Sequence, residues 1–261
     1  GCQGVELVLD DITPDGSTPM EYAKALCAHA KEQGLEVPIY TTGANFFVKE
    51  PEKELERLCR HIDIAAECKI PLLRHDVAWG YYEGYTGIKS YKKVIEAVAP
   101  FVRQTAEYAR ERGVKTCSEN HGYLLQDSAR MLELFAAVDH PNYGFLCDMG
   151  NFTVVDEDCA TAVSALSDYI VHVHAKDMLV RSGMNFDPGR GYNLSRGGNY
   201  WRGTIFGHGN VPTFQILSAI RRSVYDGYVS LEFEGMEPVL EGVEIGTQNL
   251  QHMIEAVGKM R

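Results

Sequence analysis

Short apolar runs alternate with longer amphipathic stretches along the whole chain. The apolar runs predict strands near residues 4–10, 37–43, 71–79, 114–120, 143–152, 169–178 and 228–235. The amphipathic stretches predict helices at 20–34, 52–69 and 90–113, near 127–138, 157–168 and 212–225, and in a last segment that ends near 257. Strands that alternate with helices of this length are typical of βαβ units in a parallel sheet.

The seven units follow one another without a linker rich in Pro, Ser or charge, so residues 1–261 are predicted to form a single domain. A (β/α)₈ TIM barrel has eight strands. Either one strand is overlooked or the first βα unit is absent from this chain, and the lack of an initiator Met favours the second option. A doubly wound open sheet is the alternative, but it usually carries a Gly-rich turn after its first strand, and the sequence has none. Pro100 predicts a kink or a break in the third helix.

Composition narrows the function classes. Hydrophobic residues make up 45% of the chain and charged residues 23%, which is typical of a soluble globular protein. We expect no membrane association, because no apolar run reaches the roughly 18 residues of a membrane span. The net charge of −11 argues against a nucleic-acid partner. Seven cysteines without a CxxC motif argue against a disulfide framework and favour the reducing cytoplasm.

Polar residues gather where four of the predicted strands end. Side chains alternate along a strand, so residues two apart share a side. On this basis the shared sides carry Cys117, Glu119 and His121, then Leu146 and Asp148, then His172 and His174, and finally Ser230, Glu232 and Glu234. Carboxylates and imidazoles in a barrel mouth must be paired, hydrogen-bonded or bound to a metal.

Two Glu, one Asp and one His form a mixed oxygen and nitrogen donor set. Such a set suits Mn²⁺, Co²⁺ or Mg²⁺ with open positions for substrate, whereas a structural zinc site is richer in Cys or His. Each residue also has a simpler interpretation. His172 alone is more typical of a satisfied core histidine, and either Glu232 or Glu234 could be an ordinary carboxylate at a strand exit.

Five segments together resemble the sugar phosphate isomerase/epimerase family, the xylose isomerase-like TIM barrels. They are "VPIYTTGANF", "SENHG", "CDMGNF", "HVHAKD" and "GYVSLEFEG", and the likeness covers nearly the whole chain in order. The resemblance implies a barrel with one divalent metal, held by Glu119, Asp148, His174 and Glu232, with Glu234 competing for the last place. It also implies that the opening βα unit of the family is absent here. We expect Mn²⁺ in the site, with Co²⁺, Mg²⁺ or Zn²⁺ as alternatives.

The resemblance further implies a metal-dependent sugar or polyol isomerase or epimerase that acts through a metal-stabilised enediolate. Members of the ketose 3-epimerase kind use the two metal-binding glutamates as an acid/base pair, here Glu119 and Glu232. His121 could equally be a base or a hydroxyl-binding group. His75 is a further candidate for the substrate site, unless it pairs with Asp76.

Three other residues are candidates for substrate contacts. Lys176 follows the metal histidine and either binds a substrate oxygen or neutralises Asp177 at the rim, and we favour the rim. Trp79 opens the tyrosine-rich stretch 79–85, whose aromatic rings could line the cleft. Arg202 belongs to a long loop at about 179–210 that holds four arginines and eight glycines. Such a loop is expected to be a lid over the substrate or a subunit interface in a homo-oligomer.

Other functions remain open at this point. The same barrel and metal could serve a lyase, either an inosose-type dehydratase or an enzyme that cleaves C-glycosides. DNA repair in the manner of endonuclease IV would need more histidines and a basic face, which the sequence lacks. A non-catalytic sugar-binding relative is the last alternative.

Overall fold

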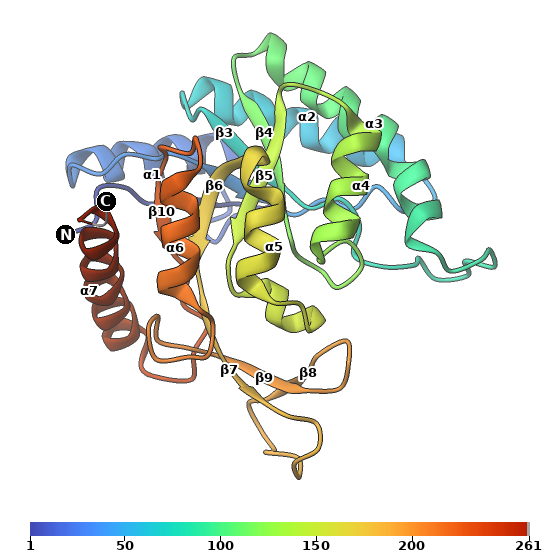
Figure 1. The fold of residues 1–261 in the computed structure, drawn as a ribbon. Coiled ribbons are helices and arrows are strands. Elements are labelled where there is room, and N and C mark those ends of the chain that lie inside the picture. The colour runs from blue at the N-terminus through green and yellow to red at the C-terminus, as the bar shows by residue number, and fades with distance from the viewer. Residues whose placement is uncertain (260–261) are drawn as a thin grey trace. The chain divides into compact units, whose positions relative to one another are not determined.

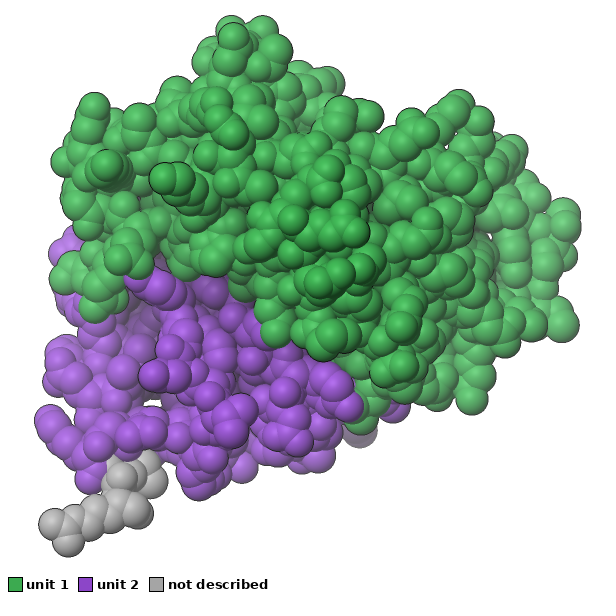
Figure 2. Space-filling view, turned by 90° about the horizontal axis from the view of Figure 1, so that it is seen from above, with its two compact units in different colours: residues 1–125, 130–144 green, residues 126–129, 145–261 purple. Residues whose placement is uncertain are grey.

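The structure is a computed structural model that describes residues 1–259. The chain divides into two compact units, coloured separately in Figure 2. Unit 1 comprises residues 1–125 and 130–144, and unit 2 comprises residues 126–129 and the rest of the described chain from residue 145. Among the described residues, no helix combines the length and the apolar character that crossing a bilayer requires.

Unit 1 contains four parallel strands in chain order. They are β1 (Leu7–Val8), β2 (Tyr40–Thr42), β3 (Leu72–His75) and β4 (Lys115–Glu119). The connecting helices are α1 (Pro19–Glu32), α2 (Pro51–Glu67) and α3 (Tyr91–Glu111), and Figure 1 shows α2 and α3 side by side. Each strand therefore returns to its parallel neighbour through a helix, as the sequence predicted.

Local sequence explains where α1 begins and how α3 continues through a proline. Thr18 caps α1 in a capping box with Glu21, and Pro19 occupies the first helical position. Helix α3 runs without interruption through Pro100, so the predicted break is wrong. Pro100 is exposed, so the carbonyl that loses its helical donor can bond to water, while buried residues such as Val98 and Val102 keep the opposite face packed.

Unit 2 contains three parallel strands in the order β5, β6 and β10. They are β5 (Tyr143–Asp148), of which residues 145–148 belong to this unit, β6 (Ile170–Ala175) and β10 (Val229–Leu231). Its helices are α5 (Cys159–Leu166), α6 (Thr213–Arg222) and α7 (Val239–Gly258), with short 3₁₀ turns η1 (Asn151–Val155) and η2 (Ser167–Tyr169). Helix α4 (Ser128–Val138) begins in unit 2 and continues in unit 1. The described chain thus holds the seven parallel strands and seven α-helices that the sequence predicted.

Unit 2 also contains a small antiparallel sheet where the sequence predicted a loop. Strands β7 (Asp177–Arg181), β8 (Asn193–Leu194) and β9 (Tyr200–Thr204) form it in the order β7, β9, β8 (Figure 1). The predicted loop at 179–210 therefore contains strands, and its role as a lid or an interface stays a prediction. The bulky residues of β7 and β9 favour strand pairing, and glycines supply the turns between them, including Gly198 at φ 88°.

The buried carboxylate of Asp177 joins the two ends of the segment that contains this antiparallel sheet. Asp177 accepts hydrogen bonds from the backbone N–H groups of Met178 and Val211 at 2.8 and 3.1 Å. Its other oxygen accepts from Gly207 and Gly209 at 2.9 and 2.8 Å. Asp177 therefore fastens the start of the segment 178–211 to its end.

Candidate metal centre

Three potential metal ligands converge at the ends of the parallel strands of unit 2. Asp148 is the last residue of β5, His174 lies one residue before the end of β6, and Glu232 directly follows β10. The strand register places Asp148 opposite His174, and Ser230 of β10 opposite His174 on the other side. One potential ligand atom from each of the three residues lies within 4.8 Å of the others.

The carboxylate of Asp148 is oriented by the backbone that follows β5. Its Oδ1 accepts hydrogen bonds from the N–H groups of Gly150 and Asn151, both at 2.8 Å. Its Oδ2 lies 4.0 Å from Nδ1 of His174. Asp148 is fully buried, so this arrangement directs one oxygen of the carboxylate to the other two residues.

Glu232, and not Glu234, joins this group. Its Oε2 lies 2.9 Å from Nδ1 of His174. Burial alone would raise the pKa of Glu232, but the hydrogen bond from His174 and the charge of Lys176 hold that pKa well below its ordinary value. The side chain of Glu234 is 52% exposed and touches only the edge of the group, with its Oε2 3.3 Å from the Lys176 ammonium.

Lys176 is the buried countercharge of these carboxylates. Its Nζ lies 3.0 Å from Glu232 Oε2 and 3.2 Å from Asp148 Oδ2. The prediction that Lys176 neutralises Asp177 at a solvated rim is wrong, because both side chains are buried and Asp177 binds backbone amides instead. The carboxylates of Asp148 and Glu232 hold the Lys176 ammonium between them, which shows that this group of side chains attracts positive charge. The donor set fits a divalent ion that prefers oxygen and nitrogen ligands.

His172 behaves as the sequence suggested for a core histidine. It is buried, and its Nε2 lies 3.0 Å from Ser230 Oγ on the neighbouring strand β10. Its ring packs edge-on against that of His174, with the centroids 5.7 Å apart. His172 therefore supports the ring of His174 from behind.

Unit 1 holds a second polar cluster, at the ends of β3 and β4. Glu119, the last residue of β4, accepts from Arg74 Nη2 at 2.7 Å, and its side chain is 5% exposed. Arg74 also donates to both carboxylate oxygens of Asp76. Asp76 in turn lies 3.1 Å from Nδ1 of His121, the half-exposed histidine that follows β4.

His75 is fully buried in unit 1. Its ring lies between those of Phe46 and Tyr143, and its Nδ1 donates to the backbone carbonyl of Asp76 at 2.8 Å. Burial lowers the pKa of His75 to about 4. This position does not favour the predicted contact with substrate.

The predicted aromatic lining begins with an exposed tryptophan. The Trp79 side chain is 60% exposed, and its ring lies over Gly43, where a Cβ atom would come within 2.9 Å of it. The tyrosines that follow pack around the ring of Phe47 instead, namely Tyr81, Tyr82 and Tyr85. Only Trp79 of this stretch keeps the exposure that a ligand-stacking ring needs.

Arg202 lies on β9 in the antiparallel sheet. Its guanidinium sits over the ring of Tyr192, 5.8 Å from the centroid, and 3.6 Å from Oε1 of Glu237. Its role in substrate binding stays a prediction.

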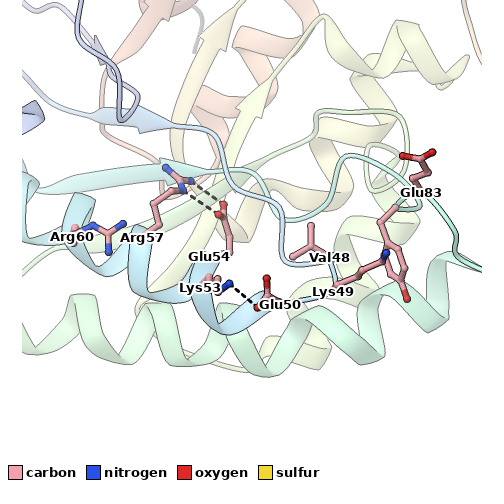
Figure 3. Close-up of a pocket in the computed structure, with 9 residues that line it drawn as sticks. Val48, Lys49, Glu50, Lys53, Glu54, Arg57, Arg60 and Glu83 are labelled. Atoms are coloured by element: carbon pink, nitrogen blue, oxygen red, sulfur yellow. Dashed lines mark hydrogen bonds and ion pairs between the residues drawn. The ribbon is translucent and has the colours of Figure 1, made fainter. Parts of the chain in front are cut away.

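A pocket of about 540 Å³ opens at the start of α2 (Figure 3). Its wall contains two ion pairs, Lys53 with Glu50 at 2.7 Å and Arg57 with Glu54 at 2.9 Å. None of the residues predicted for the active site lines this pocket.

Sequence reasoning missed Arg74 and Asp76. Both are buried and join two predicted site residues of unit 1. The available signal was their spacing, because residues two apart at the end of a strand share the side that faces the site.

Comparison with known proteins agrees with this architecture. The model of the "Xylose isomerase-like TIM barrel" family matches residues 1–256. The inosose dehydratase of Lacticaseibacillus casei is 28% identical over 142 residues, an alignment that spans 53% of this chain and 47% of that enzyme. The chain therefore covers about half the length of the curated relatives it matches.

Two solved structures share the fold. A D-tagatose 3-epimerase-like protein has a TM-score of 0.73 at 18% identity, covering 98% of this chain and 90% of that one. A xylose isomerase-like TIM barrel protein from Mycobacterium smegmatis, in complex with magnesium, has a TM-score of 0.70 at 18% identity, covering 96% and 85%. The barrel predicted from the sequence is thereby confirmed, and the chain belongs to the xylose isomerase-like TIM barrel family.

Proposed function

We propose that this protein is a divalent-metal-dependent isomerase or epimerase of a sugar or polyol. The observation that carries the proposal is the convergence of Asp148, His174 and Glu232 from three successive parallel strands of unit 2. Ligands from adjacent strand ends are what a barrel enzyme of this family would need to hold one metal ion.

Glu119 is the fourth ligand in this proposal. It matches the "SENHG" segment on which the family resemblance rests, and it ends a parallel strand as Asp148 does. Its side chain is almost completely buried, so its charge requires a cation nearby. Arg74 Nη2 lies 2.7 Å from its Oε2.

A bound divalent ion would act as a Lewis acid on a carbonyl and the adjacent hydroxyl of the substrate. Glu232 and Glu119 would then remove and return the proton on the carbon that carries this hydroxyl, next to the carbonyl. Glu232 is a carboxylate and is therefore ionised at neutral pH, as a base must be. Mn²⁺ is the ion we propose first, with Mg²⁺, Co²⁺ and Zn²⁺ as alternatives.

A lyase is the second candidate, and the similarity to an inosose dehydratase favours it. The same proton abstraction, followed by loss of a hydroxide from the next carbon, gives elimination in place of epimerisation. The two reactions share every residue named so far.

Metal content and a matched pair of variants test the site. Protein purified without chelators should hold about one divalent ion per chain. Glu232→Gln should lose it, whereas Glu234→Gln, which changes a carboxylate only two residues away, should retain it. A wild type that takes up none of Mn²⁺, Mg²⁺, Co²⁺ or Zn²⁺ would refute the proposed function.

Isotope exchange separates the two reactions. Metal-loaded protein is incubated in D₂O with ketoses and with inososes, and the substrate is followed by NMR. An epimerase incorporates deuterium at the carbon beside the carbonyl and yields a product of the same composition. A lyase yields a product that has lost water, and turnover of that kind would establish the alternative.

A further inference from the structure

The ends of β3 and β4 place a row of ionisable groups on one side of the sheet in unit 1. The register pairs Arg74 with Cys117, so alternation brings Asp76 level with Glu119 and puts both on the same side. His121 is two residues beyond Glu119 and continues the row. The two strands thus assemble four charged or polar side chains by backbone geometry alone.

Arg74 is shared between two carboxylates. Its Nη2 lies 2.9 Å from Asp76 Oδ1 and 2.7 Å from Glu119 Oε2, and its Nη1 lies 3.3 Å from Asp76 Oδ2. All three residues are less than a tenth exposed, at 6%, 8% and 7%. Planar guanidinium groups fix carboxylates in both distance and orientation, which an ammonium group cannot do.

A buried ion pair of this kind is a poor source of stability, because desolvation offsets most of the attraction between the charges. Apolar side chains of similar size would fill the same space at no such cost. The arrangement is better explained by the orientation that it gives to Glu119.

Asp76 has a second contact, with His121. Its Oδ1 lies 3.1 Å from Nδ1 of the imidazole. A carboxylate only accepts hydrogen bonds, so Nδ1 must carry the hydrogen and Nε2 is the nitrogen left to face a ligand. The His121 side chain is 49% exposed, which leaves that nitrogen accessible, while Asp76 itself is buried.

We propose that Arg74 and Asp76 are positioning residues, in which Arg74 fixes one oxygen of Glu119 and Asp76 fixes the tautomer and the direction of His121. This inference rests on the proposed function, because it assigns the pair to the proposed metal ligand Glu119 and to His121, the predicted base or hydroxyl-binding group. Outer partners of this kind typically change metal affinity or activity 10- to 100-fold when they are removed.

The first test reads the His121 ring directly. Protein labelled with ¹⁵N-histidine is examined by two-bond ¹H–¹⁵N NMR at a pH where the imidazole is neutral, with His121→Gln for assignment. The wild type should show hydrogen on Nδ1, and Asp76→Ala should shift the ring toward the Nε2–H form that a free imidazole prefers. A wild-type Nε2–H ring, or a tautomer that Asp76→Ala leaves unchanged, would overturn the proposal.

The second test measures binding of Mn²⁺ alone by calorimetry. Arg74→Met should bind Mn²⁺ 10- to 100-fold more weakly than the wild type, and Arg74→Lys should recover part of the loss. Arg57→Met is the control, because Arg57 also pairs with a glutamate and with a backbone carbonyl of unit 1 but contacts none of these residues. Mn²⁺ binding by Arg74→Met within twofold of the wild type would overturn the role of Arg74.

The two tests also separate this inference from the proposed function. If the wild type binds no divalent ion, the proposed function fails, and the tautomer of His121 still decides the role of Asp76. If the wild type binds Mn²⁺ and both sets of variants behave like it, only the positioning role fails. If Arg74→Met does not fold, Arg74→Lys is compared with the wild type for Mn²⁺ binding, and Asp76→Asn for the tautomer of His121.

Discussion

At the scale of single residues, Asp148 divides its two carboxylate oxygens between two tasks. Oδ1 accepts the amide hydrogens of Gly150 and Asn151, and Oδ2 lies toward His174 and Lys176. The turn after β5 therefore fixes the direction of the oxygen that would meet a metal. This turn has no room for a side chain at Gly150, since a Cβ there would come within 2.9 Å of the Lys176 carbonyl oxygen.

Asp148→Asn should separate these two tasks. The amide oxygen can still accept from the turn, but its NH₂ group then points at the site and cannot bind a cation. We expect Mn²⁺ affinity to fall at least 100-fold, while the free energy of unfolding falls by only about 1–2 kcal/mol. Calorimetry and urea unfolding measure the two quantities. Retained Mn²⁺ binding would exclude Asp148 as a ligand.

His75 predicts a loss of stability in acid. Its pKa of about 4 lies below the value of roughly 6.5 for an unfolded histidine, so between these values the unfolded chain binds a proton that the folded protein does not. Stability is therefore full above about pH 6.5 and falls as the pH drops toward 4, by about 3 kcal/mol in total. Urea unfolding at a series of pH values measures it.

The matched variant is His75→Phe, which keeps a ring between Phe46 and Tyr143 but cannot titrate. Its stability should depend less steeply on pH between 6.5 and 4 than that of the wild type. Some slope should remain, because burial also lowers the pKa of His61. Identical slopes in the two proteins would contradict the prediction.

At the scale of elements, α3 tolerates an interior proline at an energetic cost. Pro100→Ala should raise the free energy of unfolding by about 1–2 kcal/mol, because proline costs roughly 3 kcal/mol in a helix and the more flexible unfolded chain offsets part of the gain. Chemical denaturation measures the change. Ala97→Gly, at another exposed position of α3, should lower it by about 1 kcal/mol and calibrates the scale. Destabilisation by Pro100→Ala would mean that the ring makes contacts that alanine cannot replace.

The elements show which structures a sequence pattern can predict. The parallel strands and the helices follow from the spacing of apolar residues, which is a local property. The antiparallel sheet depends on the pairing of Asp177 with Thr204, which are far apart in the chain. The many glycines of the segment between them are typical of a loop. Tertiary pairing of this kind leaves little periodicity in the sequence.

At the scale of the whole molecule, a bound metal should stabilise the folded state by mass action. Free Mn²⁺ at about 100 times its Kd should add roughly 2.7 kcal/mol to the free energy of unfolding. Thermal unfolding with and without Mn²⁺, after treatment with a chelator, measures the effect. Glu234→Gln should respond as the wild type does and Glu232→Gln should not. An equal response from both variants would place the ion at another site.

Site residues differed in how far the sequence could predict them. Asp148, His174 and Glu232 could be named because each stands in a segment that resembles a known family and lies toward the carboxyl end of a predicted strand. The spacing of Arg74 and Asp76 places both on one side, but the ion pair of Arg74 with Glu119 depends on the register between β3 and β4, which no local pattern specifies. Lys176 was named, but its burial among carboxylates depends on Asp148 and Glu232 from other strands.

The closure made by Asp177 has a consequence for how this protein can change over evolution. Because one carboxylate holds Met178 to Gly207, Gly209 and Val211, the two ends of the stretch between them are fixed to each other within unit 2. Asp156 also binds Ser195, Gly197 and Asn199, so only a change of length in the exposed turn at 182–190 avoids these contacts and need not disturb β6 or His174. The turn between β7 and β8 is thus a place where a lineage or a protein engineer can change the length of the chain while Asp148, His174 and Glu232 remain in place.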